Sequence, residues 1–544
     1  MSFQLLTDDC LYEIFKYLEK DKFTLYTCLF VNRRWCETSV QLLWRNVFNY
    51  NTLIKCLPDD SKEILFKNEI ILPSLNSNPP LFNYVSFVKS LSINEISRTI
   101  EVILHDHNVI QNYKIIKNRL LSKNLSNTDR VQLIKDYQII KRRLVKYIQI
   151  VKNDPYLKDH QLVKNFHHAF PLISESPKNN RPITSKYLIT VVTQEVFKMF
   201  MNQISLRELN YYSSSSLTYY VPNITFTVYP GATDCFKNLT ELRCCSDVHS
   251  EFFFQLSQFC HKIRFLEIRL RRVISTGVTN LISAQNHLMC LRLWQNNKGL
   301  KEILPSLTKH LNSISRIDIN VEDNKSLLFL TNFTNLRELV FFEFYDIHES
   351  FQEFQHVKIP KLRTLKFQYK FPKSVYLDRF LENNGNHLID ISLEYSNNSI
   401  NSSVAKYCPN LKSFSTIIVD DEFDILKLIF DRCEKLESIK FVCEYGWYKK
   451  FHLENELFDI IARFSPKNFQ KLKIRYIGNA LNVRSELSPE EMNLFFINWN
   501  NRTPRRSLSL TMEEFSFKIN EEIIEIINNY VKLGVVKEFT LNNM

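Results

Sequence analysis

The stretch LTELRC, residues 239–244, sets a frame that recurs through most of the chain. Its first, fourth and sixth positions are apolar. The frame starts again at residues 263 (IRFLEI), 288 (LMCLRL), 314 (ISRIDI), 336, 362, 388, 411 and 436. Successive starts lie 22 to 26 residues apart, inside the period of roughly 20–29 residues at which short strand-containing units repeat in solenoid proteins. The frame therefore predicts a repeat architecture.

Weaker copies extend the repeat in both directions. They start at residues 88 (VKSLSI), 206 (LRELNY), 469 (FQKLKI), 505 (RRSLSL) and 536 (VKEFTL). Apolar residues at helical spacing precede most frames, for example Phe252, Phe253, Leu256 and Phe259. A unit of one helix and one short strand cannot bury its apolar face alone, so neighbouring units must stack. We expect an α/β fold, a curved solenoid of helix and strand repeats with the strands on the inner face.

The first fifty residues show a different pattern. Residues 5–36 read LLTDDCLYEIFKYLEKDKFTLYTCLFVNRRWC. Thr7 is a plausible N-cap of one amphipathic helix and Asp21 of a second, and a third carries Val31, Trp35 and Trp44. Segments below roughly 40 residues rarely close a core of their own. The excess of apolar residues therefore indicates that something else covers this segment.

The order of these capping residues, apolar positions and tryptophans resembles that of the F-box, and the resemblance covers residues 4 to about 48. It implies a three-helix module that inserts apolar side chains into a Skp-type adaptor of a cullin and RING ubiquitin ligase. Leu6 stands where many F-boxes carry proline, which removes a rigid entry turn. The positions that match the adaptor contacts of the family are Leu5, Leu6, Ile14, Leu18, Leu25, Val31 and Trp35. Some of these side chains could equally be apolar only to hold the small bundle together.

The repeats are similar to those of the leucine-rich-repeat class of F-box proteins. Most of the asparagines usual at the ninth position of such repeats are replaced here, for example by Asp247 and Arg271. The apolar frame residues form the core, and the residues between them point away from it, since strand side chains alternate. Target-binding candidates on this surface are Arg243, Arg292, Trp294, Phe342 and Lys366. Trp294 and Phe342 are the candidates for exposed anchors, because tryptophan and other aromatic residues are enriched at interfaces.

A basic insertion separates the frames at residues 88 and 206. Residues 114–164 hold 13 Lys and Arg against 4 Asp and Glu, a balance of +9 within a chain whose net charge is +12. Apolar residues from Leu133 to Val151 fall at helical spacing. Three interpretations remain open: a solvated helix packed on the solenoid, a docking surface for an acidic partner, or a nucleic-acid contact, which is the least favoured because no recognised reading module is present.

We expect four regions along the chain. They are the F-box at 1–48, a linker or first helical part of the solenoid at 49–84, the first repeat with the helical insertion (about 99–180) at 85–205, and the solenoid at 206–544. No secretory signal and no apolar run of the roughly 18 residues needed for a membrane span is evident. We therefore expect a cytoplasmic or nuclear protein without a membrane partner, whose 12 cysteines are mostly reduced, buried thiols.

Motifs for catalysis, phosphate binding and structural zinc are missing from the sequence. It contains no GxGxxG, GxxxxGK, HExxH, GxSxG or CxxC. We expect no catalytic residue, metal or other cofactor. The resemblance implies a non-catalytic receptor that brings an unidentified target protein to the ligase. The alternatives are a repeat scaffold that binds partners without any ligase, and a nucleic-acid-associated protein that uses the basic insertion.

Overall fold

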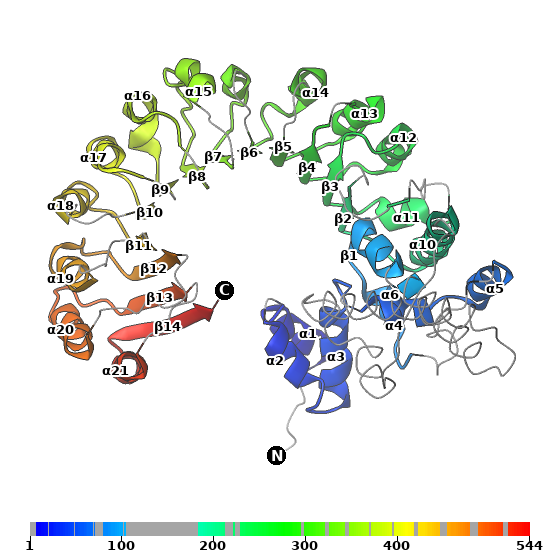
Figure 1. The fold of residues 1–544 in the computed structure, drawn as a ribbon, viewed down its shortest axis with the longest axis horizontal. Coiled ribbons are helices and arrows are strands. Elements are labelled where there is room, and N and C mark those ends of the chain that lie inside the picture. Colours follow the sequence, from blue (N-terminus) through cyan, green and yellow to red (C-terminus); the bar gives the residue numbers. More distant parts are fainter. Residues whose placement is uncertain are drawn as a thin grey trace, which may run out of the picture. The chain divides into compact units, whose positions relative to one another are not determined.

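The fold is that of a computed structural model (Figure 1). The chain divides into two compact units. One unit comprises Met1–Arg264 and Val273–Asn286, and the other comprises Phe265–Arg272 and His287–Met544. The structure describes residues 7–19, 21–47, 49–68, 70, 80–101, 103–104, 183–212, 221–222, 229–271, 273–294, 299–320, 326–342, 348–368, 371–393, 396–417, 423–445, 454–478, 488–514 and 520–543. The predicted basic helix of residues 133–151 lies outside these ranges, as do Leu5 and Leu6.

The first unit combines a helical bundle with a short parallel sheet. Its elements are α1 (Asp8–Lys16), α2 (Lys22–Cys28), α3 (Arg33–Leu43), α4 (Tyr50–Lys55), α5 (Asp59–Lys67), α6 (Tyr84–Phe87), β1 (Ser90–Ser92), α10 (Ile183–Gln203), β2 (Glu208–Tyr211), α11 (Ala232–Phe236), β3 (Glu241–Cys245), α12 (Ser250–Phe259) and α13 (Thr276–Ala284). Strands β1, β2 and β3 pair in parallel, so that Leu91, Leu209 and Leu242 lie in register.

The expected helices at the N-terminus are confirmed, with one correction. The side chains of Thr7 and Asp21 cap α1 and α2 as predicted. The third helix begins at Arg33, because Asn32 caps it by accepting from the amide of Trp35 at 2.9 Å. Val31 therefore lies before this helix, and the prediction that the helix carries it was wrong.

The N-terminal bundle continues directly into the sheet of its unit. The carbonyl of Arg45 accepts hydrogen bonds from the amides of Lys89 and Ser90 at 2.8 and 3.0 Å. The guanidinium of Arg45 also pairs with Glu19 at 2.7 Å, which fastens the end of α1 to the same point. The bundle is thus anchored by both backbone and side-chain contacts.

The second unit is a run of parallel strands, with a helical segment between each strand and the next from Cys290 onward. Its strands are β4 (Phe265–Arg269), β5 (Cys290–Trp294), β6 (Arg316–Ile319), β7 (Glu338–Phe341), β8 (Thr364–Phe367), β9 (Asp390–Leu393), β10 (Ser413–Ile417), β11 (Ser438–Tyr445), β12 (Lys471–Gly478), β13 (Leu508–Glu514) and β14 (Val536–Asn543). Its helices are α14 (Leu300–Leu307), η4 (Thr308–His310), η5 (Leu328–Asn332), α15 (His348–Phe354), α16 (Ser374–Asn384), η6 (Gly385–His387), α17 (Asn398–Tyr407), α18 (Phe423–Arg432), α19 (Glu454–Phe464), α20 (Pro489–Asn500) and α21 (Glu521–Lys532).

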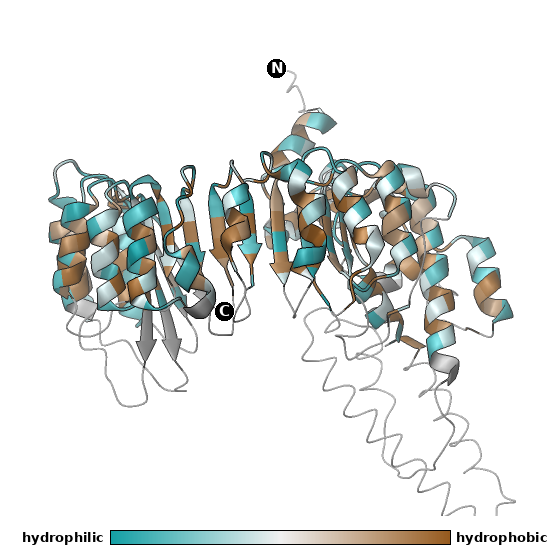
Figure 2. Cartoon of the chain, turned by 90° about the horizontal axis from the view of Figure 1, so that it is seen from above, coloured by the Kyte–Doolittle hydropathy of each residue, from teal (hydrophilic) through white to brown (hydrophobic). Residues whose placement is uncertain are grey.

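Within this unit the strands line the inner side and the helices the outer side (Figure 1). Each strand pairs with the next in sequence order from β4 to β14. From β4 to β12 the central frame residue of each strand lies in register with its neighbours and is buried, as at Leu291, Ile317, Leu339 and Leu365. Helices in Figure 2 carry hydrophobic and hydrophilic residues side by side, as expected when one face is buried. Every frame read from the sequence, weak copies included, overlaps a strand, so the predicted solenoid of helix and strand repeats is confirmed as a fold.

Phenylalanines fill the core between β7, β8, α15 and α16. Phe351 contacts Phe341, Phe354 and Phe380, with ring centroids 5.9, 5.3 and 5.6 Å apart. Phe367 stacks on Phe341 at 4.9 Å. All five rings are less than 2% exposed. Because the packing is dense, the neighbouring side chains have little freedom to fill the space that a smaller residue would leave.

Buried amides satisfy backbone groups where helices turn into strands. In the second unit, Asn384 accepts from the amide of Ile359 at 2.7 Å and donates to the carbonyls of Val357 and Phe380 at 2.8 and 3.0 Å. In the first unit, Gln285 makes the same set of bonds to Ile263, Cys260 and Leu281. These amides lie at helix ends and not at the ninth position of the repeat.

Candidate functional site

Several large apolar side chains of the N-terminal bundle are exposed to solvent and lie outside its core. They come from α1, α2 and the turn that precedes α3, within a span of 18 residues, and their exposed fractions run from 48% to 90%. They are Ile14, Tyr17, Phe23, Tyr26, Phe30 and Val31. We call this set the N-terminal apolar face. Tyr26 and Phe30 of this set are in ring contact at 5.6 Å, and clustered apolar side chains on a protein surface often mark an interaction site.

The described residues predicted to contact the adaptor fall into three classes. Ile14 and Val31 are exposed and belong to the N-terminal apolar face. Leu18 and Trp35 are half-buried, and the indole of Trp35 packs edge-on against Phe15 at 5.0 Å. Leu25 is 0% exposed. A contact of Leu25 with another protein is inconsistent with this structure, because the side chain already lies in the core of the bundle.

Reasoning from the sequence missed Tyr17, Phe23, Tyr26 and Phe30. A signal was available in α2, whose sequence KFTLYTC is apolar on more than one face. Leu25 and Cys28 face the core of the bundle. The aromatic residues on the remaining circumference must then be exposed, since a short helix that is apolar all round has more apolar surface than one core can bury.

The inner face of β4 to β7 carries an ordered cluster of ions. Asp318, which is 1% exposed, accepts from Arg292 at 2.6 and 2.9 Å and from Arg316 at 2.7 and 3.1 Å. Arg292 also approaches Glu267 at 3.5 Å, and Arg316 reaches Glu338 at 3.2 Å. Strand register explains the arrangement, since Glu267, Arg292 and Asp318 are direct neighbours on adjacent strands. We call these five residues the inner-face ion cluster.

Two aromatic rings border the inner-face ion cluster. The rings of Trp294 and Phe342 are 4.4 Å apart, and the indole nitrogen of Trp294 donates to Glu267 at 3.1 Å. Arg269 lies over the Trp294 ring at 5.2 Å, a cation–π distance. Trp294 is half-buried, whereas Phe342 is only 6% exposed. The prediction that Phe342 is an exposed anchor was wrong, because the neighbouring Trp294 packs on its ring.

The other two predicted target-binding residues lie elsewhere. In the first unit, Arg243 is half-buried and bonds Glu241 at 3.0 Å and Asn210 at 3.4 Å. In the second, Lys366 pairs with Asp390 on the next strand at 2.7 Å. All three predicted cations therefore have partners within the chain, so any target would have to compete with those partners or extend their network.

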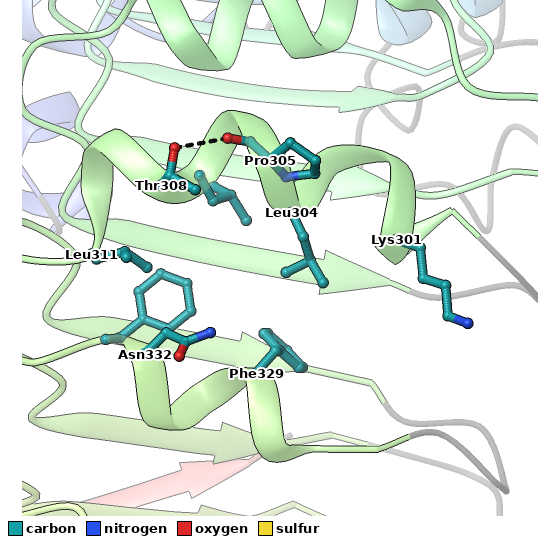
Figure 3. A pocket seen from close by; sticks show the side chains of 9 residues that line it. Lys301, Leu304, Pro305, Thr308, Leu311, Phe329 and Asn332 are labelled. Carbon is teal, nitrogen blue, oxygen red and sulfur yellow. Dashed lines mark hydrogen bonds between the residues drawn. The ribbon is translucent and has the colours of Figure 1, made fainter.

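A pocket of about 330 Å³ opens on the outer layer of the second unit, between α14 and η5 (Figure 3). Its walls are mostly apolar, and the hydroxyl of Thr308 donates to the carbonyl of Pro305 at 2.9 Å. The lining residues are Lys301, Leu304, Pro305, Leu307, Thr308, Leu311, Phe329, Asn332 and Phe333. No carboxylate, thiol or imidazole is among them, so this lining offers no acid, base or nucleophile pair.

Several buried thiols of the described residues are unreactive groups. Burial raises the pKa of Cys235, Cys260 and Cys433 to about 12, and burial followed by the charge of Asp318 does the same for Cys290. Thiolates are the nucleophilic and metal-binding form. Within the described ranges, no three His, Cys, Asp or Glu residues lie together as a metal site would require. No described helix is both long and apolar enough to cross a bilayer.

Comparisons with known proteins add little. No protein-family model and no curated protein matches the chain. One solved structure that matches is an internalin from Listeria monocytogenes str. 4b F2365, with 12% sequence identity and a TM-score of 0.25, covering 64% of this chain and 82% of the internalin chain. At that TM-score the likeness carries no argument, and the fold rests on the strand register described above.

Proposed function

We propose that the chain is a non-catalytic substrate receptor of a Skp, cullin and F-box type of ubiquitin ligase. The N-terminal apolar face supports this proposal more than any other feature. Six large apolar side chains on one small bundle are exposed and therefore contribute little to the core of the bundle itself. The sequence of the same bundle resembles the module that binds a Skp-type adaptor. The adaptor would in turn connect the chain to the cullin and RING subunits.

The energetics of the apolar face suit a stable protein contact. Full burial of an exposed Ile, Val or Phe side chain yields about 1.5–3 kcal/mol. A few such residues can supply most of the binding free energy that remains after the entropic and desolvation costs of association are subtracted. Tyr26 and Phe30 are already in contact, with ring centroids 5.6 Å apart. Aromatic pairs held in this way lose little conformational freedom on binding.

The solenoid would hold the target. Its inner side presents polar and charged side chains from successive strands, and the inner-face ion cluster fixes their positions. Ubiquitin transfer would occur on the other subunits. The contribution of this chain would be to hold a target lysine near the reactive thioester, which raises the effective concentration of the reacting groups.

Adaptor capture by the full-length chain tests this function. The double variant Ile14→Asp, Val31→Asp places charge on two exposed positions of the apolar face. We expect its affinity for the Skp-type adaptor to fall at least about tenfold, since two contacts of hot-spot size exceed the 1.4 kcal/mol that tenfold requires. Phe66→Asp is the matched control, because Phe66 is 74% exposed on α5. Retention of adaptor by the double variant, or no capture by the intact chain, contradicts the proposal.

The alternative is a repeat scaffold that binds partner proteins without a ligase. The burial of Leu25 favours it, because one of the residues matched to the adaptor contacts is 0% exposed. Under this alternative the apolar face would contact a different protein. Purification of the chain with its partners, but without adaptor or cullin, would select the scaffold.

A further inference from the structure

The turns that lead from helix to strand in the second unit form a strongly basic edge. These turns are 287–289, 308–315, 333–337, 355–363, 385–389, 408–412, 433–437, 465–470, 501–507 and 533–535. Together they hold eleven Lys and Arg and two acids, Glu434 and Glu437. The cations are Lys309, Arg337, Lys358, Lys361, Arg363, Lys412, Lys435, Lys467, Arg502, Arg505 and Arg506. We call this set the basic edge.

The side chains of the basic edge are accessible and keep most of their charge. All except the half-buried Arg502 are exposed. Lys361, Lys435 and Arg506 each donate to an asparagine of the preceding turn, at 3.3, 2.6 and 3.0 Å. A neutral amide orients the cation without cancelling it. Lys412 differs, because it pairs with Glu437 at 2.7 Å.

Helix ends alone do not account for this charge. A helix C-terminus carries about half a negative charge and favours nearby cations. The ten helical segments that end on this edge therefore offset about five of the nine excess cations. Adjacent turns follow the strand spacing of about 4.8 Å, so the positive charges of neighbouring turns lie in a row. The turns 287–289, 385–389 and 533–535 interrupt this row, because they hold no Lys or Arg.

Exposed apolar side chains interrupt the cations in one line of this edge. The residue directly before each strand is Arg337, Arg363, Ile389 and Lys412 in four consecutive repeats, linked by backbone bonds of 2.8 to 2.9 Å. Ile389 is 37% exposed, and Met289 occupies the same position before β5 with 46% exposure. No exposed aromatic residue occurs at this position in these repeats to stack on a base. A polypeptide with both carboxylates and apolar side chains fits this row better than a nucleic acid.

We propose that the basic edge binds an acidic, extended segment of a partner protein in which apolar residues are interspersed with Asp and Glu. The carboxylates pair with Arg337, Lys361 and Lys435, and apolar side chains rest on Ile389. The proposal does not depend on the N-terminal apolar face or on a ligase.

Binding of a labelled peptide by the full-length chain tests the proposal. The probe is a repeat of Glu-Glu-Leu about 12 residues long, enough to follow the row at about 3.3 Å per residue. Fluorescence anisotropy is read at low and at high salt. We expect saturable binding that weakens with salt, because exposed charges are screened. A peptide of the same length with Lys in place of Glu should not bind.

The decisive variant is Arg337→Gln, Lys361→Gln, Lys435→Gln, and we expect it to weaken binding of the acidic peptide about tenfold. The matched control, Lys301→Gln, Lys373→Gln, Arg379→Gln, removes three exposed cations from the helical side of the same unit and should bind normally. Circular dichroism checks that both variants are folded. Equal binding by the two variants overturns the proposal, as does tighter binding of a single-stranded oligonucleotide of similar length than of the acidic peptide.

Discussion

Replacement of Asn384 by alanine should destabilise the second unit by about 2–4 kcal/mol. The side chain is 2% exposed and makes three hydrogen bonds to backbone groups. Its loss leaves the buried amide of Ile359 without its partner, which costs about 1–3 kcal/mol. The carbonyls of Val357 and Phe380 each lose a donor, and a small cavity adds to the cost.

Urea unfolding followed by circular dichroism measures the effect. Asn383→Ala is the matched control, because Asn383 is the adjacent residue, is only half-buried and bonds the carbonyls of Arg379 and Gln355 at 3.0 and 3.4 Å. We expect the control to cost no more than about 1 kcal/mol. If Asn384→Ala costs no more than Asn383→Ala, the buried amide is not what holds this turn, and the reasoning fails.

Two further predictions follow from burial. Phe351→Ala should cost about 3–5 kcal/mol, because the ring is 0% exposed and contacts four others. A loss below about 1 kcal/mol in the same urea assay would mean that the cluster repacks. Burial raises the pKa of Cys235, Cys260 and Cys433 from 9.0 to about 12. These thiols therefore lose their protons at a lower pH in the unfolded chain than in the folded one, and the free energy of unfolding should fall as the pH rises from 9 towards 12. In native protein at pH 9, iodoacetamide should modify the exposed Cys10 and spare those three; fast modification of any of them would contradict the burial argument.

Local pattern was enough to predict the repeat strands and the first two helices of this protein. The frame of apolar positions recurs every 22 to 26 residues, and each copy overlaps a strand. Residues such as Leu291 and Ile317 face the core in register because period and alternation encode which side of a strand is buried. Capping residues likewise marked the first two helices, since a side chain at the N-cap satisfies backbone amides of its own turn.

Exposure at the candidate sites was less predictable. Alternation placed Phe342 and Trp294 on one surface, but the first is 6% exposed because the second packs on it. Leu25 matched a family contact, yet it lies in the core of its bundle. Both errors arise because a strand or helix pattern gives the direction of a side chain and not the neighbours that cover it.

The sequence by itself determined the repeat, its strands and the short apolar bundle at its start. Tertiary structure alone decided which distant residues meet. Stacking of the repeats brings Glu267, Arg292 and Asp318 side by side although they are 25 and 26 residues apart, and it gathers single cations of successive turns into the basic edge. Neighbours across a parallel sheet are about 4.8 Å apart whatever their separation in sequence. Contacts of this kind depend on register, which no single repeat contains.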